Sequence, residues 1–521
     1  MKQIFFLFLF QIGISYGQNF QNIMITDYAN PNEPSIMINP ANPQNIVVGE
    51  NSRFYYVSND SGNTWIQKEI ASQWSLSGYI SDPAIIVDNS GNFYFFHLSN
   101  SSEQGGWLDR IVCQKSTDNG NTFSLDTYMG YNPPTDQDKQ WGVIDNQNNN
   151  IYVTWTQFDE YGSNDPNKHS NILFSKSTDG GQTWTNAIQI NEVPGDCIDS
   201  DNTVEGATPA VGPNGEVYVS WVGPAGLMFD KSTDFGQTWL QNDIVVNDMQ
   251  NSGGWDFNIP GIDRCNGLPI IKCDLSNSPH HGTIYINWSD QRNGSNNTDI
   301  WLAKSTNGGQ TWSAPIRVNN DNSNHHQFLT WMDIDQTNGY LYFVFYDRRN
   351  YNDNSTDVYL AVSRDGGNTF DNIKISESPF VPFSQRFFGD YSNISVHNGI
   401  IRPVWTRLEQ NGNQSLWTAI LTENQLANIR DNKSLVETSI YPVPAKNNIY
   451  VKYRLTKETK ISMNLLDETG RLVKKLISEK KRNSGKNVDN FNIQSLNLNK
   501  GIYYFQLKTP TFTKILRMIK I

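Results

Sequence analysis

The eight residues Ser58-Asn59-Asp60-Ser61-Gly62-Asn63-Thr64-Trp65 decide the fold, because the chain carries six copies of their pattern. The pattern is Ser-x-Asp/Asn-x-Gly-x-Thr-aromatic, and the other copies span residues 116–123, 177–184, 232–239, 305–312 and 363–370. Asp stands at the third place in five copies, and Asn307 in the sixth. The copies begin roughly 55 to 73 residues apart, a period that indicates repeated supersecondary units.

Each copy reads as a tight turn between two strands. Asp at the third place can accept hydrogen bonds from turn amides, and Gly at the fifth place supplies a positive φ. The aromatic residue begins the next strand and packs inward. The pattern resembles the Asp-box (BNR repeat) of sialidase-like β-propellers. This resemblance implies an all-β propeller in which the boxes stabilise turns on the face opposite the active site.

The apolar runs between the boxes are β-branched and aromatic and are bounded by Gly, Asn and Asp, which is typical of strands. First strands begin near Ser35, Pro83, Trp141, Pro209, Leu268, Phe328 and Tyr391, which indicates seven units. The seventh has no box and no fourth strand, but residues 22–26 form a spare strand. Pairing these would close the ring and remove an exposed edge. We therefore expect a seven-bladed propeller over residues 18–421, with six blades as the alternative.

The amino terminus predicts export. Met1-Lys2-Gln3, the apolar run 4–10 and the small residues Ser15 and Gly17 are typical of a signal peptide over residues 1–17. No later stretch is long and apolar enough for a membrane helix. The chain has four cysteines, compatible with one or two disulfides, and Cys265 with Cys273 is the favoured pair.

The carboxyl-terminal segment differs in charge and composition. Residues 441–521 hold 17 Lys and Arg against 5 Asp and Glu, which leaves 23 basic against 47 acidic residues upstream. A body this acidic repels polyanions, so nucleic acid is not an expected partner. After a polar linker, 422–440, come Tyr441-Pro442-Val443-Pro444-Ala445, Gly501-Ile502-Tyr503-Tyr504 and a basic end. The segment 441–521 resembles the C-terminal sorting domain of type IX secretion, a small β-sandwich. The resemblance implies that the type IX machinery is a partner and that the protein is secreted or displayed on the cell surface.

Chemistry is expected at the mouth of the central channel, where the loops ahead of each first strand converge. The charged and polar residues at these places are Glu33, Asp82, Lys139, Glu205, Arg264, His326, Asp390 and Tyr391. A second set of loops, between second and third strands, adds Asp159, Glu160, Asp290, Arg292, Asp347, Arg348, Arg349 and Arg407.

The sialidase resemblance implies an Asp acid/base, a Tyr nucleophile activated by a Glu, and arginines that bind the substrate carboxylate. We expect Asp82, Glu205 and Tyr391 as catalytic residues. We expect Arg292, Arg348 and Arg386 as substrate-binding residues. A structural alternative is a local ion pair between Arg292 or Arg348 and the aspartate just before it. The family's first arginine has no clear counterpart, because the only arginine before the first box is Arg53.

Two functional hypotheses follow. The first is a secreted sialidase-like glycoside hydrolase, or less favourably a polysaccharide lyase, acting on an extracellular glycan or glycoprotein. The second is a non-catalytic propeller that binds glycan or protein at the cell surface, since a fold does not dictate an activity. No cofactor is expected, although Asp- and Asn-rich loops such as 290–299 and 350–357 are compatible with calcium.

Overall fold

The computed structural model describes residues 20–75, 80–100, 108–198, 202–249, 257–409, 411–427, 435–455, 458–509 and 513–521. The chain divides into two compact units, Met1–Ile420 and Leu421–Ile521. The predicted signal peptide lies outside the described residues. Within those ranges, no helix has both the length and the apolar character needed to span a bilayer.

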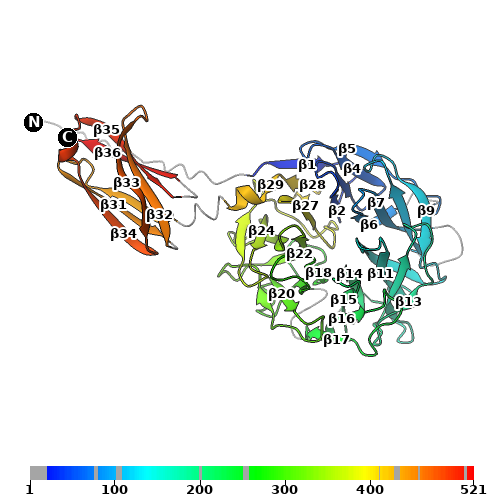
Figure 1. The fold of residues 1–521 in the computed structure, drawn as a ribbon. Helices are drawn as coiled ribbons and strands as arrows, with labels where there is room; N and C mark the ends of the chain where they lie inside the picture. The colour runs from blue at the N-terminus through cyan, green and yellow to red at the C-terminus, as the bar shows by residue number, and fades with distance from the viewer. Residues whose placement is uncertain are drawn as a thin grey trace, which may run out of the picture. The chain divides into compact units, whose positions relative to one another are not determined.

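The first unit consists of antiparallel four-stranded sheets (Figure 1). The first three sheets are β2 (Ser35–Ile38), β3 (Ile46–Gly49), β4 (Phe54–Ser58), β5 (Ile66–Glu69); β6 (Ile80–Val87), β7 (Phe93–Ser99), β8 (Arg110–Ser116), β9 (Ser124–Met129); and β10 (Asp136–Ile144), β11 (Ile151–Phe158), β12 (Ser170–Ser177), β13 (Ile188–Gln189). The next three are β14 (Glu205–Val211), β15 (Val217–Gly223), β16 (Gly226–Ser232), β17 (Ile244–Asn247); β18 (Ile270–Cys273), β19 (Ile284–Asp290), β20 (Asp299–Ser305), β21 (Ile316–Arg317); and β22 (Gln327–Asp335), β23 (Tyr340–Asp347), β24 (Asp357–Ser363), β25 (Asp371–Lys374).

A seventh sheet among the described residues joins the two ends of the unit. It holds β26 (Asn393–His397), β27 (Ile400–Leu408), β28 (Gln414–Ala419) and, from the amino terminus, β1 (Asn22–Thr26); β29 (Leu421–Thr422) also pairs with β27. Ile23 of β1 lies opposite Thr418 of β28, which confirms the pairing expected for the spare strand. The first strands of successive sheets contact one another, and β26 contacts β2. This is a β-propeller, closed by its first strand.

Apolar side chains fill the space between neighbouring sheets. One buried cluster, for example, contains Phe96 from β7 and Trp155 from β11. The strands are buried on both faces along much of their length, which explains why their sequences are continuous apolar runs rather than alternating ones.

The repeated octapeptide forms the turn between the third and fourth strands of six sheets. In the copy that follows β12, the Ser177 hydroxyl donates to Asp179 Oδ1 at 2.7 Å and accepts from the Gly181 amide at 2.9 Å. Asp179 Oδ1 also accepts from the Thr183 amide at 2.9 Å. Burial tends to raise the pKa of Asp179, but these hydrogen bonds outweigh it and lower the pKa to about 2. The turn is thus stabilised locally, by its own side chains.

Replacing Ser177 by Ala should lower the free energy of unfolding by roughly 1–2 kcal/mol, because the buried Gly181 amide loses its acceptor. Chemical denaturation of the purified protein measures this. The control is Ser90→Ala at an exposed turn position, where a change within about 0.5 kcal/mol is expected. Equal midpoints for both variants would show that the hydroxyl contributes nothing to the turn.

The cysteine prediction is wrong. All four cysteines are buried, and no disulfide joins any two of them. Cys265 lies in the segment ahead of β18 and Cys273 is the last residue of that strand, so an extended strand separates the favoured pair. A disulfide requires the two Cα atoms to lie within about 7 Å, which an extended strand prevents.

The second unit has two sheets around one core. The first holds β30 (Leu435–Tyr441), β31 (Asn448–Leu455) and β34 (Gly485–Asn492), and the second holds β32 (Thr459–Leu466), β33 (Leu472–Arg482), β35 (Gly501–Lys508) and β36 (Thr513–Lys520). A short 3-10 helix, η1, spans Gln494–Leu496. Val451, Met463 and Phe505 share the buried cluster, so the sheets pack as a small sandwich. Strand β30 begins inside the predicted linker.

Candidate functional site

Several residues in, or just ahead of, the first strands of the sheets have a strained backbone. The ladder between first and second strands is interrupted by a bulge in β6, β10, β14 and β22. The bulges hold Asp82 at φ 50°, Lys139 at 53° and Leu329 at 47°, and Glu33, just ahead of β2, has φ 47°. Non-glycine residues in this region cost roughly 1–3 kcal/mol each and persist only where the surroundings impose them. Three of these four residues are ionisable.

The charged side chains of these segments meet in a mouth cluster, defined here as Glu33, Asp82, Lys139, Arg264 and Asp390. Lys139 Nζ lies 2.8 Å from Asp390 Oδ2 and 3.5 Å from Asp82 Oδ2. Arg264 Nε donates to Asp390 Oδ1 at 3.0 Å, and Arg264 Nη2 pairs with the second oxygen of that carboxylate. The cluster therefore joins residues from β6, β10 and the segments ahead of β2, β18 and β26.

Glu33 occupies the most enclosed place in the cluster, with 1% of its surface exposed. Glu33 Oε1 accepts from the Asp390 amide at 3.1 Å, and Oε2 accepts from the Asn51 side chain. Burial, and then the negative charge of Asp82, raise the pKa of Glu33 well above its usual range. Glu33 is therefore protonated, and so uncharged, at mildly acidic pH, where an ordinary glutamate is ionised.

Asp390 lies in the opposite electrostatic situation. Burial alone would raise the pKa of Asp390, but Lys139 and Arg264 outweigh it and lower the pKa to about 2. Burial alone would likewise lower the pKa of Lys139, but Asp138, Asp390 and Asp82 raise it well above its usual range. Two neighbouring carboxyl groups thus differ in charge at mildly acidic pH, one neutral and one ionised.

Three aromatic rings lie beside the cluster. The Trp141 ring centroid is 4.4 Å from that of Trp331 and 5.1 Å from that of Tyr391. Both tryptophans line a cavity of about 20 Å³ that also borders Asp390 and Leu329. They also line a second cavity, of about 160 Å³, which lies further along the first strands. Burial, followed by the charges of Asp82 and Glu33, raises the pKa of Tyr391 well above its usual range, so its hydroxyl is neutral.

The structure brings some of the predicted catalytic residues together. Asp82 belongs to the mouth cluster, and Tyr391 follows Asp390 directly in the chain. Glu205 is buried at the first position of β14, where it pairs with Val222 across the ladder.

The predicted substrate-binding arginines lie on separate loops. Arg292 Nε pairs with Asp290 at 2.9 Å, as in the structural alternative. Arg348 does not pair with Asp347, because Arg349 takes that carboxylate instead. Arg386 is exposed and donates to the Asn30 side chain and the Gly412 carbonyl. Among the contacts of the described residues, none links these arginines to Asp82, Glu205 or Tyr391.

The sequence indicates a place at the channel mouth for Glu33, Lys139, Arg264 and Asp390. None of the four is among the predicted catalytic or substrate-binding residues. Their only signal was a charged residue ahead of, or early in, a first strand. The positive φ at Glu33 and Lys139 has no such signal, since neither residue type favours it.

In the part of the chain that the structure describes, no group of three or more His, Cys, Asp or Glu side chains could hold a metal ion. The predicted loops 290–299 and 350–357 instead use their aspartates locally: Asp290 pairs with Arg292, and Asp353 accepts from the Ser355 amide.

Comparison with known proteins identifies the second unit. Residues 439–521 match the model of the secretion system C-terminal sorting domain. This domain directs type IX secretion to the cell surface or the extracellular space, which confirms the predicted localisation. No curated protein matches the sequence.

Several solved structures are similar to much of this chain at low identity. A protein of unknown function from Dyadobacter fermentans is 12% identical, with a TM-score of 0.45 over 77% of this chain and 97% of that one. A polysaccharide lyase, PL25 ulvan lyase, bound to -[GlcA(1-4)Rha3S]-, is 11% identical, with a TM-score of 0.49 over 77% and 96%. The NanB sialidase from Streptococcus pneumoniae is 10% identical, with a TM-score of 0.43 over 73% and 84%. These values are too low to transfer an activity.

Proposed function

We propose that this protein is a secreted glycan-cleaving propeller whose reaction centre is the mouth cluster, with Glu33 as the general acid. The observation that carries the proposal is the pair of neighbouring carboxyl groups with pKa values driven in opposite directions, Glu33 upward and Asp390 downward. Glycosidic bond cleavage needs a protonated carboxyl group beside an ionised one. Export supports an extracellular substrate.

A purely structural role accounts poorly for the cluster. Buried ion pairs are often replaceable by apolar residues without loss of stability, because desolvation offsets the attraction between the charges. Here three of the ionisable groups, Glu33, Asp82 and Lys139, also sit on a strained backbone. Costly arrangements of this kind concentrate at active sites.

The proposed reaction assigns a role to each group. Glu33 donates its proton to the glycosidic oxygen as the bond to the anomeric carbon breaks, and that oxygen keeps the bonding electrons. Asp82 accepts a proton from the water that adds to the anomeric carbon. Lys139 and Arg264 hold Asp390 ionised, so that Asp390 supplies the negative charge beside the reacting sugar. Tyr391, whose hydroxyl stays neutral, positions the sugar by hydrogen bonding rather than acting as the nucleophile. Glu205, at the start of β14, remains a candidate for a further catalytic carboxyl group.

Hydrolysis assays on a panel of sialylated, uronate-bearing and neutral glycans test the proposal. Release of reducing ends from one class, by protein that is folded by circular dichroism, is the expected result. A panel without any turnover would favour the second candidate, a non-catalytic glycan-binding propeller. One observation favours that candidate over a sialidase: Arg292, Arg348 and Arg386 are each held by a different loop.

The raised pKa of Glu33 predicts a pH-dependent stability. An unfolded glutamate ionises near pH 4.3, whereas folded Glu33 keeps its proton to higher pH. Between these two pKa values the folded state binds more protons, so the contribution of Glu33 to stability falls as pH rises. Glu33→Gln removes this loss, so the stability of the variant relative to the wild type should increase from pH 4.5 to pH 8. Urea denaturation at several pH values measures it. A constant difference across this range would mean that Glu33 titrates normally.

A further inference from the structure

A second pocket lies on the loops of the fifth and sixth sheets, apart from the mouth cluster. Its volume is about 270 Å³. Its lining includes Pro260, Asn324, His326, Arg348, Tyr351 and Asp353. No residue of this lining belongs to the mouth cluster. The volume lies just under the range of about 300–1,000 Å³ typical of pockets for drug-sized ligands, so it suits a single sugar unit.

Arg348 is the most deeply buried charged group of this pocket, with 3% of its surface exposed. Arg348 Nε donates to Thr356 Oγ1 at 3.0 Å and Nη1 to the Pro260 carbonyl at 2.6 Å. Nη2 is buried and has no hydrogen-bond partner among the described residues. The guanidinium group also lies 5.3 Å from the Phe328 ring centroid. Burial lowers the pKa of Arg348 to about 10, so the group is still charged at neutral pH.

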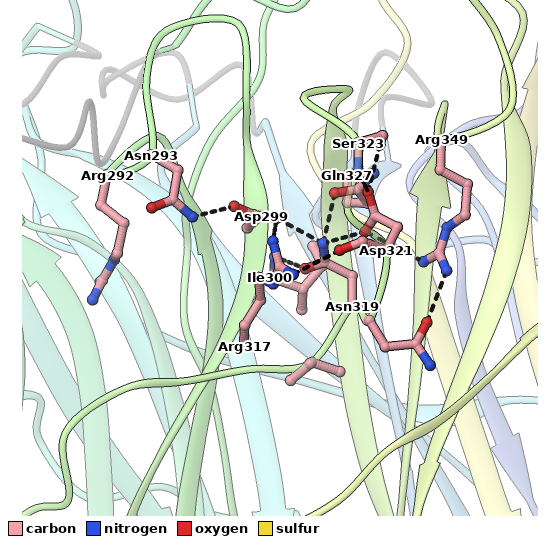
Figure 2. A network of polar contacts seen from close by, with 12 residues as sticks. Arg292, Asn293, Asp299, Ile300, Arg317, Asn319, Asp321, Ser323, Gln327 and Arg349 are labelled. Carbon is pink, nitrogen blue, oxygen red and sulfur yellow. Dashed lines mark hydrogen bonds and ion pairs between the residues drawn. The ribbon is translucent and has the colours of Figure 1, made fainter.

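Other arginines nearby are neutralised, whereas Arg348 is not. Arg349 pairs with Asp347, and Arg317 lies 3.5 Å from Asp299. Figure 2 shows Arg317 and Asp299 within a network centred on Asn319, whose Nδ2 lies 2.6 Å from Asp299 Oδ1 and 2.7 Å from Gln327 Oε1. No ion pair joins Arg348 to a carboxylate in the described part of the chain. The network also fixes the loop between Asn319 and Gln327, which carries three lining residues of the pocket.

Most of the remaining lining is neutral and polar. His326 Nδ1 lies 3.0 Å from Thr298 Oγ1, and burial together with the charge of Arg348 lowers the pKa of His326 to about 4, so the ring is uncharged at neutral pH. Four asparagines and Tyr351 offer groups suited to sugar hydroxyls. Asp353 is exposed, so the positive charge lies inside the pocket and the negative charge at its rim.

We propose that this pocket binds the carboxylate or sulfate of an acidic sugar unit, with the anion on Arg348 Nη2 and the sugar hydroxyls on the surrounding asparagines. Arginine binds both anions through charge-assisted hydrogen bonds. The sugar identity of the ligand rests on the proposed function, whereas the anion site rests on Arg348 alone. The pocket would then select acidic glycans and hold them on the face of the propeller that carries the mouth cluster.

Isothermal titration at fixed ionic strength tests this with four compounds: glucuronate, glucose 6-sulfate, glucose and sodium sulfate. Both acidic sugars should bind. Glucose should bind at least about tenfold more weakly because it lacks the charge-assisted bond to Arg348, and sulfate alone should bind at least about tenfold more weakly because it lacks the hydroxyl groups that the asparagines bind. Glucose binding as tightly as glucuronate would overturn the anion site. Sulfate binding as tightly as glucose 6-sulfate would overturn the sugar ligand.

Variants locate the site. Asn324→Asp adds a negative charge at the exposed rim of the pocket without changing the contacts of Arg348 and should weaken both acidic sugars by about threefold, the effect expected of an exposed charge. Asn411→Asp adds the same charge outside the pocket and should leave binding unchanged. Arg348→Gln should abolish binding if the variant folds.

Glu33→Gln separates the two proposals, because it should stop glycan cleavage and leave titration of the acidic sugars unchanged. Loss of this binding in Glu33→Gln, or unaltered binding in Asn324→Asp, would overturn the Arg348 site. Binding with no cleavage of any glycan by the wild type would overturn the proposed function alone.

Discussion

Replacing Glu33 by Gln should lower the turnover of the cleaved glycan by roughly 100- to 10,000-fold, the contribution typical of a general acid. The amide cannot donate the proton to the leaving oxygen, but it is nearly the same size and can still accept from the Asp390 amide. The melting temperature at pH 7 should stay the same or rise, because the variant removes a buried carboxyl group that is costly to ionise. Initial rates and thermal unfolding, measured on the same preparations, give both quantities.

The matched control is Asp230→Asn in β16. Burial raises the pKa of Asp230 to about 7, so this variant also neutralises an unusual buried carboxyl group, but outside the mouth cluster. Its turnover should stay within a few-fold of the wild type. If Glu33→Gln retained the wild-type rate while folded, or if Asp230→Asn lost as much, the assignment of the general acid would fail.

Removing residues 435–521 should change where the protein accumulates. These residues span β30 to β36 and include the match to the sorting domain. The propeller should still fold, because its ring closes through β1 and β28 rather than through any strand after residue 435. Without its sorting domain the truncated chain should cross the inner membrane and remain in the periplasm.

Cell fractionation of a bacterium with a type IX system decides this, with the full-length chain as the control. The truncated protein should be found almost entirely in the periplasmic fraction, and its purified form should melt cooperatively. Truncated protein in the medium at the full-length level would contradict the sorting role. A truncated protein that did not fold would show that the propeller depends on the second unit.

The fold was predictable because its signals are local. The side-chain hydrogen bonds of Ser177 and Asp179 lie within one octapeptide, so the sequence pattern specifies the turn by itself. The closure by residues 22–26 was predictable because an unpaired strand and an incomplete unit remained at the two ends of the repeat.

The site was predictable only in part, because its contacts are long-range. Asp82 was identified from its place ahead of a first strand, but its neighbour Lys139 is 57 residues away in the chain. The loop geometry decides that Arg349, and not Arg348, pairs with Asp347. Arg348 instead donates to the carbonyl of Pro260, which is 88 residues away in the chain. Residue patterns along one strand carry no information about such contacts between sheets.

The most direct measurement is a crystal structure of the Glu33→Gln variant with an oligosaccharide that the wild type cleaves. We expect a glycosidic oxygen within about 2.6–3.2 Å of the side-chain amide at position 33, the distance that proton donation requires. Asp82 should face the anomeric carbon of the same linkage, and Lys139 and Arg264 should still hold Asp390. An oligosaccharide bound elsewhere on the propeller, with no sugar at the mouth cluster, would show that the mouth cluster is not the reaction centre.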